Sequence, residues 1–233
     1  MFPDLLKDFQ SIAQPERRQR LLDEGYVRIP DPSSVCTVYH KPDSNTVLRF
    51  SMRPEMTVLT NKYLIENAGN PYLPRVIAHG EIHGGKHLTV MEKLISSQDL
   101  SDEMDVDLLG QARAIATFPF GDKIHTAAHL QFAKDPEFLQ AVRVLVNCAA
   151  ESFKNPSSKN ECLFPDRNPN GVMYRLGADG MPFPVLVDTL TYTAPSQELE
   201  SQLEGVVTRL QRFEAAQNKR TLTASRKGSL TPA

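Results

Sequence analysis

Residues 25–92 contain five short segments with the residue pattern of β-strands and a single segment with the pattern of a helix. The strand-like segments are rich in β-branched and aromatic residues and are separated by Pro, Gly, Asn and Ser; they are residues 26–29, 35–40, 46–50, 75–80 and 87–92. Residues 54–66 instead place apolar side chains at helical spacing. The order strand-strand-strand-helix-strand-strand predicts a small antiparallel α+β layer with its helix on one face of the sheet.

The rest of the chain is mainly helical in pattern. Apolar residues recur at helical spacing in residues 2–24 (with an interruption at Pro15), 105–116, 136–153 and 197–216. A polar linker begins at residue 97, so we expect a domain boundary near residues 94–97. Residues 217–233 carry Lys219, Arg220, Arg226 and Lys227, no acid and no apolar periodicity, which predicts a disordered basic tail. The predicted segments are an N-terminal helical extension (1–24), the α+β layer (25–96), a helical layer (97–216) and the tail (217–233).

Two carboxylates lie at the two ends of a predicted hairpin in the second half of the chain. Residues 172–175 and 185–187 have strand patterns, and residues 176–182 between them contain Asp-Gly and Pro, which predict a turn. A hairpin brings its two ends together, and so would bring Asp166 and Asp188 to one site. The pair could act as a general base, hold a divalent metal, or do both. The alternative is that Asp166 is a turn residue and Asp188 a strand-end cap.

Length and composition limit the function classes. A chain of 233 residues with 40% apolar residues can form one or two domains with a sizeable core. Its net charge of −2 does not favour a general attraction to nucleic acid or membrane; we expect nucleic-acid contact only through the basic tail. Three scattered cysteines without C-x-x-C spacing fit reduced thiols. No signal peptide or membrane-spanning run is predicted, and we expect a soluble, cytoplasmic protein.

The histidines form two patterns of interest. His125 and His129 stand at i and i+4, a spacing that can bind zinc on one helix face, but no Glu follows His125 and no third ligand is evident. His79, His83 and His87 recur every four residues across a predicted strand-turn-strand, where that period has no common face. We therefore expect these three to be surface histidines.

The complete order of elements resembles the protein kinase-like fold. Asp166 is followed, after four residues, by Gly171-Val172-Met173 where that superfamily has its catalytic loop and a short strand, and Val185-Leu186-Val187-Asp188 stands where it has the strand carrying a metal-binding Asp. Leu73-Pro74-Arg75-Val76 and Asp188-Thr189-Leu190 are similar to landmarks of small atypical serine/threonine kinases of phages and bacteria, such as the early kinases of podoviral coliphages. The resemblance covers residues 25–192. It implies a two-lobed α+β fold, with a five-stranded antiparallel N-lobe containing one helix and a mainly helical C-lobe.

The resemblance also implies roles for individual residues. Asp166 would accept the proton of a protein Ser/Thr hydroxyl, or orient that hydroxyl, during phosphoryl transfer. Asp188 would hold Mg²⁺ at the phosphates of ATP, with Asn170 as the nearest amide to the second metal position. Arg49 would be the strand cation that contacts the phosphates. The hinge that pairs with adenine would be Glu92, Lys93 and Leu94.

Several residues depart from the kinase pattern. Arg49 replaces a Lys, and the two are not interchangeable at a tight phosphate site. Gly171 stands where the metal-binding Asn is expected, and residues 31–34 between the first two strands contain no Gly. The helical Glu that pairs with the strand cation has only Glu55 and Glu66 as candidates. Two hypotheses follow: an ATP- and Mg²⁺-dependent serine/threonine kinase, favoured by the retention of Asp166 and Asp188, and an inactive pseudokinase that binds a protein partner. A small-molecule acceptor also remains open.

Overall fold

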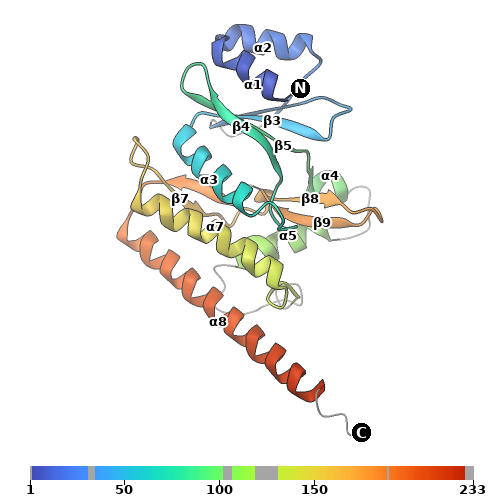
Figure 1. The fold of residues 1–233 in the computed structure, drawn as a ribbon, viewed down its shortest axis with the longest axis vertical. Coiled ribbons are helices and arrows are strands. Elements are labelled where there is room, and N and C mark those ends of the chain that lie inside the picture. The colour runs from blue at the N-terminus through green and yellow to red at the C-terminus, as the bar shows by residue number, and fades with distance from the viewer. Residues whose placement is uncertain (1, 31–34, 102–106, 119–130, 188, 229–233) are drawn as a thin grey trace. The chain divides into compact units, whose positions relative to one another are not determined.

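The computed structural model describes residues 2–30, 35–101, 107–118, 131–187 and 189–228. For residues 2–5, 101 and 218–228 it describes the backbone alone. The chain divides into two compact units, unit 1 from Met1 to Ile95 and unit 2 from Ser96 to Ala233, whose elements are labelled in Figure 1. Each unit is described by itself below.

Unit 1 is built around a five-stranded antiparallel sheet with the strand order β1-β2-β3-β5-β4. The strands are β1 (Val27–Ile29), β2 (Cys36–His40), β3 (Thr46–Ser51), β4 (Val76–Ile82) and β5 (Lys86–Glu92). Gly84 and Gly85 turn the chain between β4 and β5 with φ of 85° and 66°, a left-handed backbone that favours glycine. The antiparallel α+β layer predicted from the sequence is confirmed, and each strand lies within two residues of its predicted limits.

One face of this sheet is apolar and is covered by the N-terminal helices α1 (Phe2–Ser11) and α2 (Gln14–Asp23). Alternate strand residues point to it because the side-chain period of a strand is two. The buried cluster is Phe9, Leu21, Tyr26, Tyr39, Leu48, Phe50, Ile82, Leu88 and Val90. Phe9 is fully buried, with its ring centroid 6.0 Å from that of Phe50. Residues 1–24, predicted as an extension, therefore contribute to the core of unit 1.

The other face of the sheet carries α3 (Pro54–Glu66), whose bounds agree with the prediction. Pro54 occupies the first turn, where its missing N–H costs no hydrogen bond. Helix α3 buries apolar Met56 and Leu64 and also makes polar contacts with the sheet. Asn61 Nδ2 donates to Thr89 Oγ1 at 2.8 Å, and Thr57 Oγ1 lies 2.7 Å from Ser51 Oγ.

Unit 2 contains the helices α4 (Ser97–Ser101), α5 (Leu108–Thr117), α7 (Pro136–Lys154) and α8 (Gln197–Gly228). Asp135 caps α7 by accepting from the N–H groups of Glu137 and Phe138. Helix α8 runs alongside α7 and continues past it (Figure 1). The two are joined by buried Leu203, Val206 and Leu210 of α8 and by an ion pair between Arg143 and Glu214.

Short strands complete unit 2. They are β7 (Cys162–Pro165), β8 (Val172–Leu176), β9 (Pro182–Leu186) and β10 (Leu190–Thr193), while β6 (Ile95–Ser96) stands at the division between the units. Strand β7 pairs with β10, and β8 pairs with β9, both antiparallel. Strands β7 and β10 were not predicted, because each is only four residues long and so short a segment shows no distinctive period.

The predicted disordered tail is wrong for residues 217–228, which continue α8. The segment contains no Pro or Gly before Gly228, and several of its residues are good helix formers, so nothing in the sequence ends the helix earlier. None of the helices in the described ranges is both long and apolar enough to cross a membrane.

Candidate functional site

The β8–β9 hairpin has the geometry that the sequence predicted. Val172 lies opposite Leu186, and the ladder continues to Leu176 opposite Pro182. In the turn, Asp179 Oδ1 accepts from the N–H of Met181 at 3.0 Å, and Gly180 has φ of 76°. The Asp-Gly turn therefore closes the hairpin as expected.

Two backbone hydrogen bonds bring the ends of this hairpin together. The N–H of Asp166 donates to the carbonyl of Thr189 at 2.7 Å, and the N–H of Val187 donates to the carbonyl of Gly171 at 2.9 Å. The residues on either side of position 188 are thus bonded to the two ends of the 166–171 loop. Asp188 itself lies outside the described residues, so only its flanking backbone is known.

Side chains within the 166–171 loop fix its conformation. Asp166 Oδ1 accepts from the N–H of Asn168 at 3.1 Å, and Asn168 Oδ1 accepts from the N–H of Asn170 at 3.0 Å. A 3₁₀ turn, η2 (Pro169–Gly171), follows. Asp166 is half-buried and Asn170 is exposed. An oriented, partly exposed carboxylate of this kind can accept a proton or a metal ion. Gly171 has no side chain with which to hold a metal, so a side-chain ligand from this loop would have to come from Asp166, Asn168 or Asn170.

A small cavity of about 20 Å³ lies behind Asp166. Besides Asp166 it is lined by Ile115, Ala116, Val142, Leu145, Val146, Pro165, Leu186 and Thr189. Thr189 is 8% exposed, and its Oγ1 has no hydrogen-bond partner in the described part of the chain. No sequence signal indicated that this hydroxyl would be buried beside Asp166.

Tyr174 anchors the hairpin to α5. It is fully buried, and its hydroxyl donates to the carbonyl of Leu108 at 2.8 Å. Burial raises the pKa of Tyr174, and the charge of Asp107 raises it further. Asp107 also caps α5 by accepting from the N–H of Gly110 at 2.7 Å. Strand β8 and the start of α5 are therefore fixed to each other on one side of the loop.

The remaining candidate site residues belong to unit 1. Arg49 lies opposite Val38 and Thr89 in the sheet, on the face that carries α3. At the predicted hinge, the N–H of Glu92 donates to the carbonyl of Arg75 at 3.0 Å, and that of Lys93 donates to the carbonyl of Asn45 at 2.8 Å. Leu94 is buried. Adenine pairing through the N–H groups of Glu92 or Lys93 would therefore require these bonds to break.

The helical acid that the kinase resemblance calls for is not at Glu66. Glu66 is exposed at the last residue of α3, while Thr57 and Asn61 face the sheet. Asn61 bonds to Thr89, the residue opposite Arg49. An acid was expected at this position, so the contact of Asn61 was not predicted.

The prediction of surface histidines is wrong for His87, which is 2% exposed. The spacing along the chain gives these histidines no common face, but antiparallel pairing creates one across strands. His79 of β4 lies opposite Thr89 of β5. His87 lies two residues before Thr89 on β5, so the two histidines share a face of the sheet. Their Nδ1 and Nε2 atoms are 3.1 Å apart.

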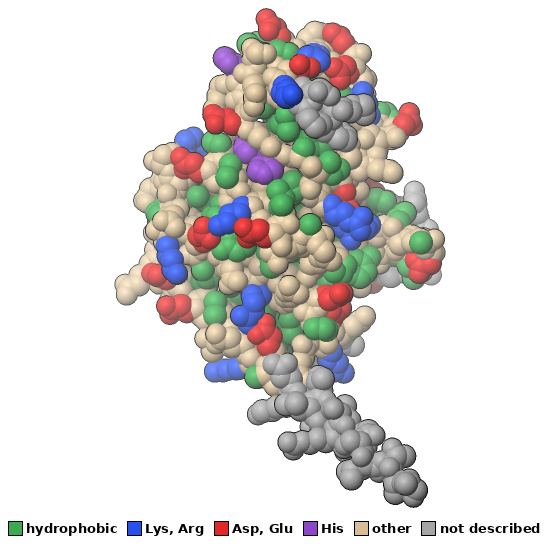
Figure 2. All heavy atoms as spheres, viewed as in Figure 1, with side chains coloured by type: hydrophobic (Ala, Val, Ile, Leu, Met, Phe, Trp, Pro, Cys, Tyr) green, Lys and Arg blue, Asp and Glu red, His purple; other side chains and the backbone are tan. Residues whose placement is uncertain are grey.

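Two further features concern ligands. Among the described residues, no three or more His, Cys, Asp and Glu side chains are grouped to hold a metal ion; Asp188, His125 and His129 lie outside that set. Lys and Arg side chains are interspersed with Asp and Glu over the face drawn in Figure 2. That face therefore does not indicate a ligand of either charge.

Comparisons with known proteins give only distant similarities. No protein-family model and no curated protein matches the chain. Among solved structures it is similar to the PK-1 kinase of Cydia pomonella granulovirus, with 15% identity over 77% of this chain and 60% of that one and a TM-score of 0.35. It is also similar to the CAK complex of Chaetomium thermophilum bound to ATP-γ-S (16% identity, 80% and 53% coverage, TM-score 0.34).

A third similar structure is the PknI kinase domain of Mycobacterium tuberculosis, with 18% identity, 71% and 59% coverage and a TM-score of 0.31. The chain thus spans between 53% and 60% of the length of these three chains. TM-scores this low do not support a conclusion about the function of this chain.

Proposed function

We propose that the protein is an atypical kinase that transfers a phosphoryl group from ATP to a Ser/Thr hydroxyl of a protein. The observation that carries this proposal is the closure of the 166–189 segment. Two antiparallel strand pairs and the bonds Asp166 N–H to Thr189 O and Val187 N–H to Gly171 O bring the Asp166 loop and the residues flanking Asp188 together. A site with one carboxylate for the nucleophile and one for a metal is what phosphoryl transfer requires.

In the proposed mechanism, Asp166 orients the acceptor hydroxyl and takes its proton. Its carboxylate is held by the N–H of Asn168, so little reorganisation is needed when the hydroxyl arrives. Asp188 and Asn170 would hold Mg²⁺, which when bound neutralises charge on the nucleotide phosphates. Arg49 would contact the phosphates, and the 92–94 segment would lie along adenine.

A second candidate function is that of a pseudokinase that binds a partner protein without catalysis. Asn61 and Thr57, both neutral, supply the polar contacts of α3 with the sheet, and Gly171 stands at the end of the 166–171 loop. An enzyme under selection for fast phosphoryl transfer would be expected to keep charged or metal-binding groups at these places.

The test measures nucleotide binding and transfer separately. Thermal unfolding is followed with ATP, with and without Mg²⁺, in the natural protein, Asp188→Asn and Asp166→Asn. A ligand at about 100 times its Kd adds about 2.7 kcal/mol to the free energy of unfolding. We expect a Mg²⁺-dependent rise in Tm that is lost in Asp188→Asn and kept in Asp166→Asn. Transfer of labelled phosphate, first to the protein itself and then to Ser/Thr-rich proteins, should be lost in both variants.

A matched control is Asp179→Asn, in the turn at the far end of the same hairpin. An amide oxygen there can still accept from the N–H of Met181, so binding and transfer should both be unchanged. A Mg²⁺-dependent rise in Tm without any transfer would favour the pseudokinase. The absence of a rise at millimolar ATP in the natural protein would refute the kinase proposal.

A further inference from the structure

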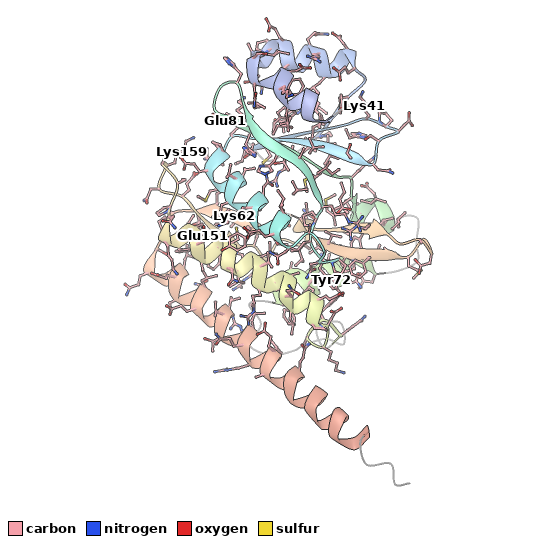
Figure 3. All side chains as sticks on the ribbon, viewed as in Figure 1. Lys41, Lys62, Tyr72, Glu81, Glu151 and Lys159 are labelled. Atoms are coloured by element: carbon pink, nitrogen blue, oxygen red, sulfur yellow. The ribbon has the colours of Figure 1, made fainter. Side chains whose placement is uncertain are left out.

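Buried polar side chains concentrate at the contact between α3 and its sheet in unit 1. They are Ser51, Thr57, Asn61, His87 and Thr89, each at most 7% exposed. On the opposite face of the same strands, Leu48, Leu88 and Val90 form an apolar core. The elements on either side of the polar contact can be found in Figure 3 from the labels of Lys62 on α3 and Glu81 on β4. Besides its buried apolar residues Met56 and Leu64, helix α3 therefore relies on hydrogen bonds to the sheet, and such bonds depend on every partner being satisfied.

The histidine pair lies on the sheet face that carries α3. His87 is opposite Ser51 of β3, and Ser51 contacts Thr57 of α3. His79 Nδ1 and His87 Nε2 are 3.1 Å apart, with ring centroids 5.3 Å apart and planes inclined by 38°. His87 Nδ1 is buried and has no hydrogen-bond partner in the described part of the chain.

Counting the donors and acceptors that find a partner favours one arrangement of protons for the pair. The 3.1 Å contact needs a proton on one nitrogen and a lone pair on the other. If His79 donates, neutral His87 carries its proton on Nδ1, and a buried N–H has no acceptor. If His87 Nε2–H donates to His79 Nδ1, only a lone pair on His87 Nδ1 remains unused, which costs less. The second arrangement is the one that the burial favours.

In this arrangement, an added proton on either imidazole ring destabilises the His79–His87 pair. A proton on His79 Nδ1 occupies the lone pair that accepts from His87 and so breaks the bond. A proton on His87 Nδ1 creates a buried cation with an unpaired donor. Burial and, secondarily, the nearby His79 lower the pKa of His87 from 6.5 to about 4, which is consistent with a neutral imidazole in the closed state.

The groups that face the pair offer limited compensation for a positive charge. From α3 come Thr57 and Asn61, which are neutral, and from β3 come Ser51 and, two residues away, the cation Arg49. On β4 the carboxylate of Glu81 lies opposite His87 but is exposed to solvent. Lys86 adjoins His87 on β5. The acids of α3 are Glu55, in its first turn, and Glu66, at its exposed end.

We propose that His79 and His87 form a proton-operated latch that holds α3 on the sheet at neutral pH and releases it on acidification. This proposal concerns the packing of unit 1 and stands apart from the proposed catalytic function. The closed state binds fewer protons than the open one, so stability of the contact is complete above about pH 6.5 and falls as the pH drops toward 4. If an opened His87 recovers its ordinary pKa, the opening equilibrium rises about tenfold between pH 7.5 and 5.5.

Hydrogen exchange with peptide resolution tests the latch. Exchange of the α3 amides is measured at pH 7.5 and 5.5 and divided by the intrinsic rate at each pH, which yields the opening equilibrium. We expect about a tenfold rise for α3 and little change for α7 of unit 2. His87→Phe and His87→Gln both remove the buried titrating group and should abolish the rise; using two variants guards against one that fails to fold.

His83→Gln is the matched control, because His83 is an exposed histidine in the turn between the same two strands. It should keep the tenfold rise. The proposal is overturned if the α3 opening equilibrium in the natural protein differs by less than twofold between the two pH values. It is equally overturned if both His87 variants keep the rise.

Discussion

Replacing Tyr174 with Phe removes a single hydroxyl from the middle of unit 2 and leaves the aromatic ring in place. Tyr174 is 0% exposed and donates to the carbonyl of Leu108 at 2.8 Å. The variant loses this hydrogen bond, which costs about 0.5–1.5 kcal/mol, while the carbonyl of Leu108, at the first residue of α5, keeps its place in the helix. For a chain of this length, each kcal/mol lowers Tm by about 2–4 °C.

The pH dependence of this loss gives a second measurement. Because burial and Asp107 raise the pKa of Tyr174, the folded protein keeps the phenol protonated where an unfolded chain would lose it. The stabilisation is therefore complete below about pH 10 and declines as the pH rises further. The difference in the free energy of unfolding between the natural protein and Tyr174→Phe should shrink above that pH, as measured by denaturant titration.

Tyr39→Phe is the control for this prediction. Tyr39 is buried in unit 1 at 7% exposure, and its hydroxyl makes no hydrogen bond to a described residue, so its removal should cost less than about 0.5 kcal/mol. Equal losses for Tyr174→Phe and Tyr39→Phe would show that the bond to Leu108 does not stabilise the hairpin, and so that Tyr174 does not support the 166–171 loop.

Two further predictions concern stability in unit 2. Thr189→Val removes a buried hydroxyl that has no partner among the described residues, so it should raise the free energy of unfolding by about 1 kcal/mol; a loss would show that the hydroxyl is bonded, for instance to a water in the adjacent cavity. Asp135→Ala removes the acceptor that caps α7 and should cost about 1 kcal/mol in the same denaturant titration, whereas Asp135→Asn should cost less than half of that.

The elements of unit 1 could be predicted because each has a strong local signal. Strands of alternating β-branched residues separated by Pro, Gly and Asn, and a helix that begins at Pro54, are visible in the sequence alone. What could not be predicted is which faces meet. The contact of His79 with His87 depends on the β4–β5 register, and the contact of Asn61 with Thr89 spans 28 residues of sequence.

The candidate site divides in the same way. The hairpin and its Asp-Gly turn could be predicted, since both depend on neighbouring residues. Strands β7 and β10 could not, since only their pairing with each other distinguishes Cys162–Pro165 from an ordinary buried loop. The tail was mispredicted because the absence of apolar periodicity was taken as the absence of structure, while the lack of a helix-ending residue was the stronger signal for residues 217–228.

The packing of α1 on the sheet has a consequence for synthesis of the chain. Phe9 leaves the ribosome about 80 residues before Leu88 and Val90, which are buried in the same cluster. At roughly 5–20 residues per second, this amounts to about 4–16 s. For most of that interval, only α2 and the strands β1 to β3, including Phe50, are available to cover the apolar side of α1. Unit 1 is thus completed by joining its first element to its last strands, so a polypeptide that begins at residue 25 would leave the apolar face of the finished sheet open to aggregation.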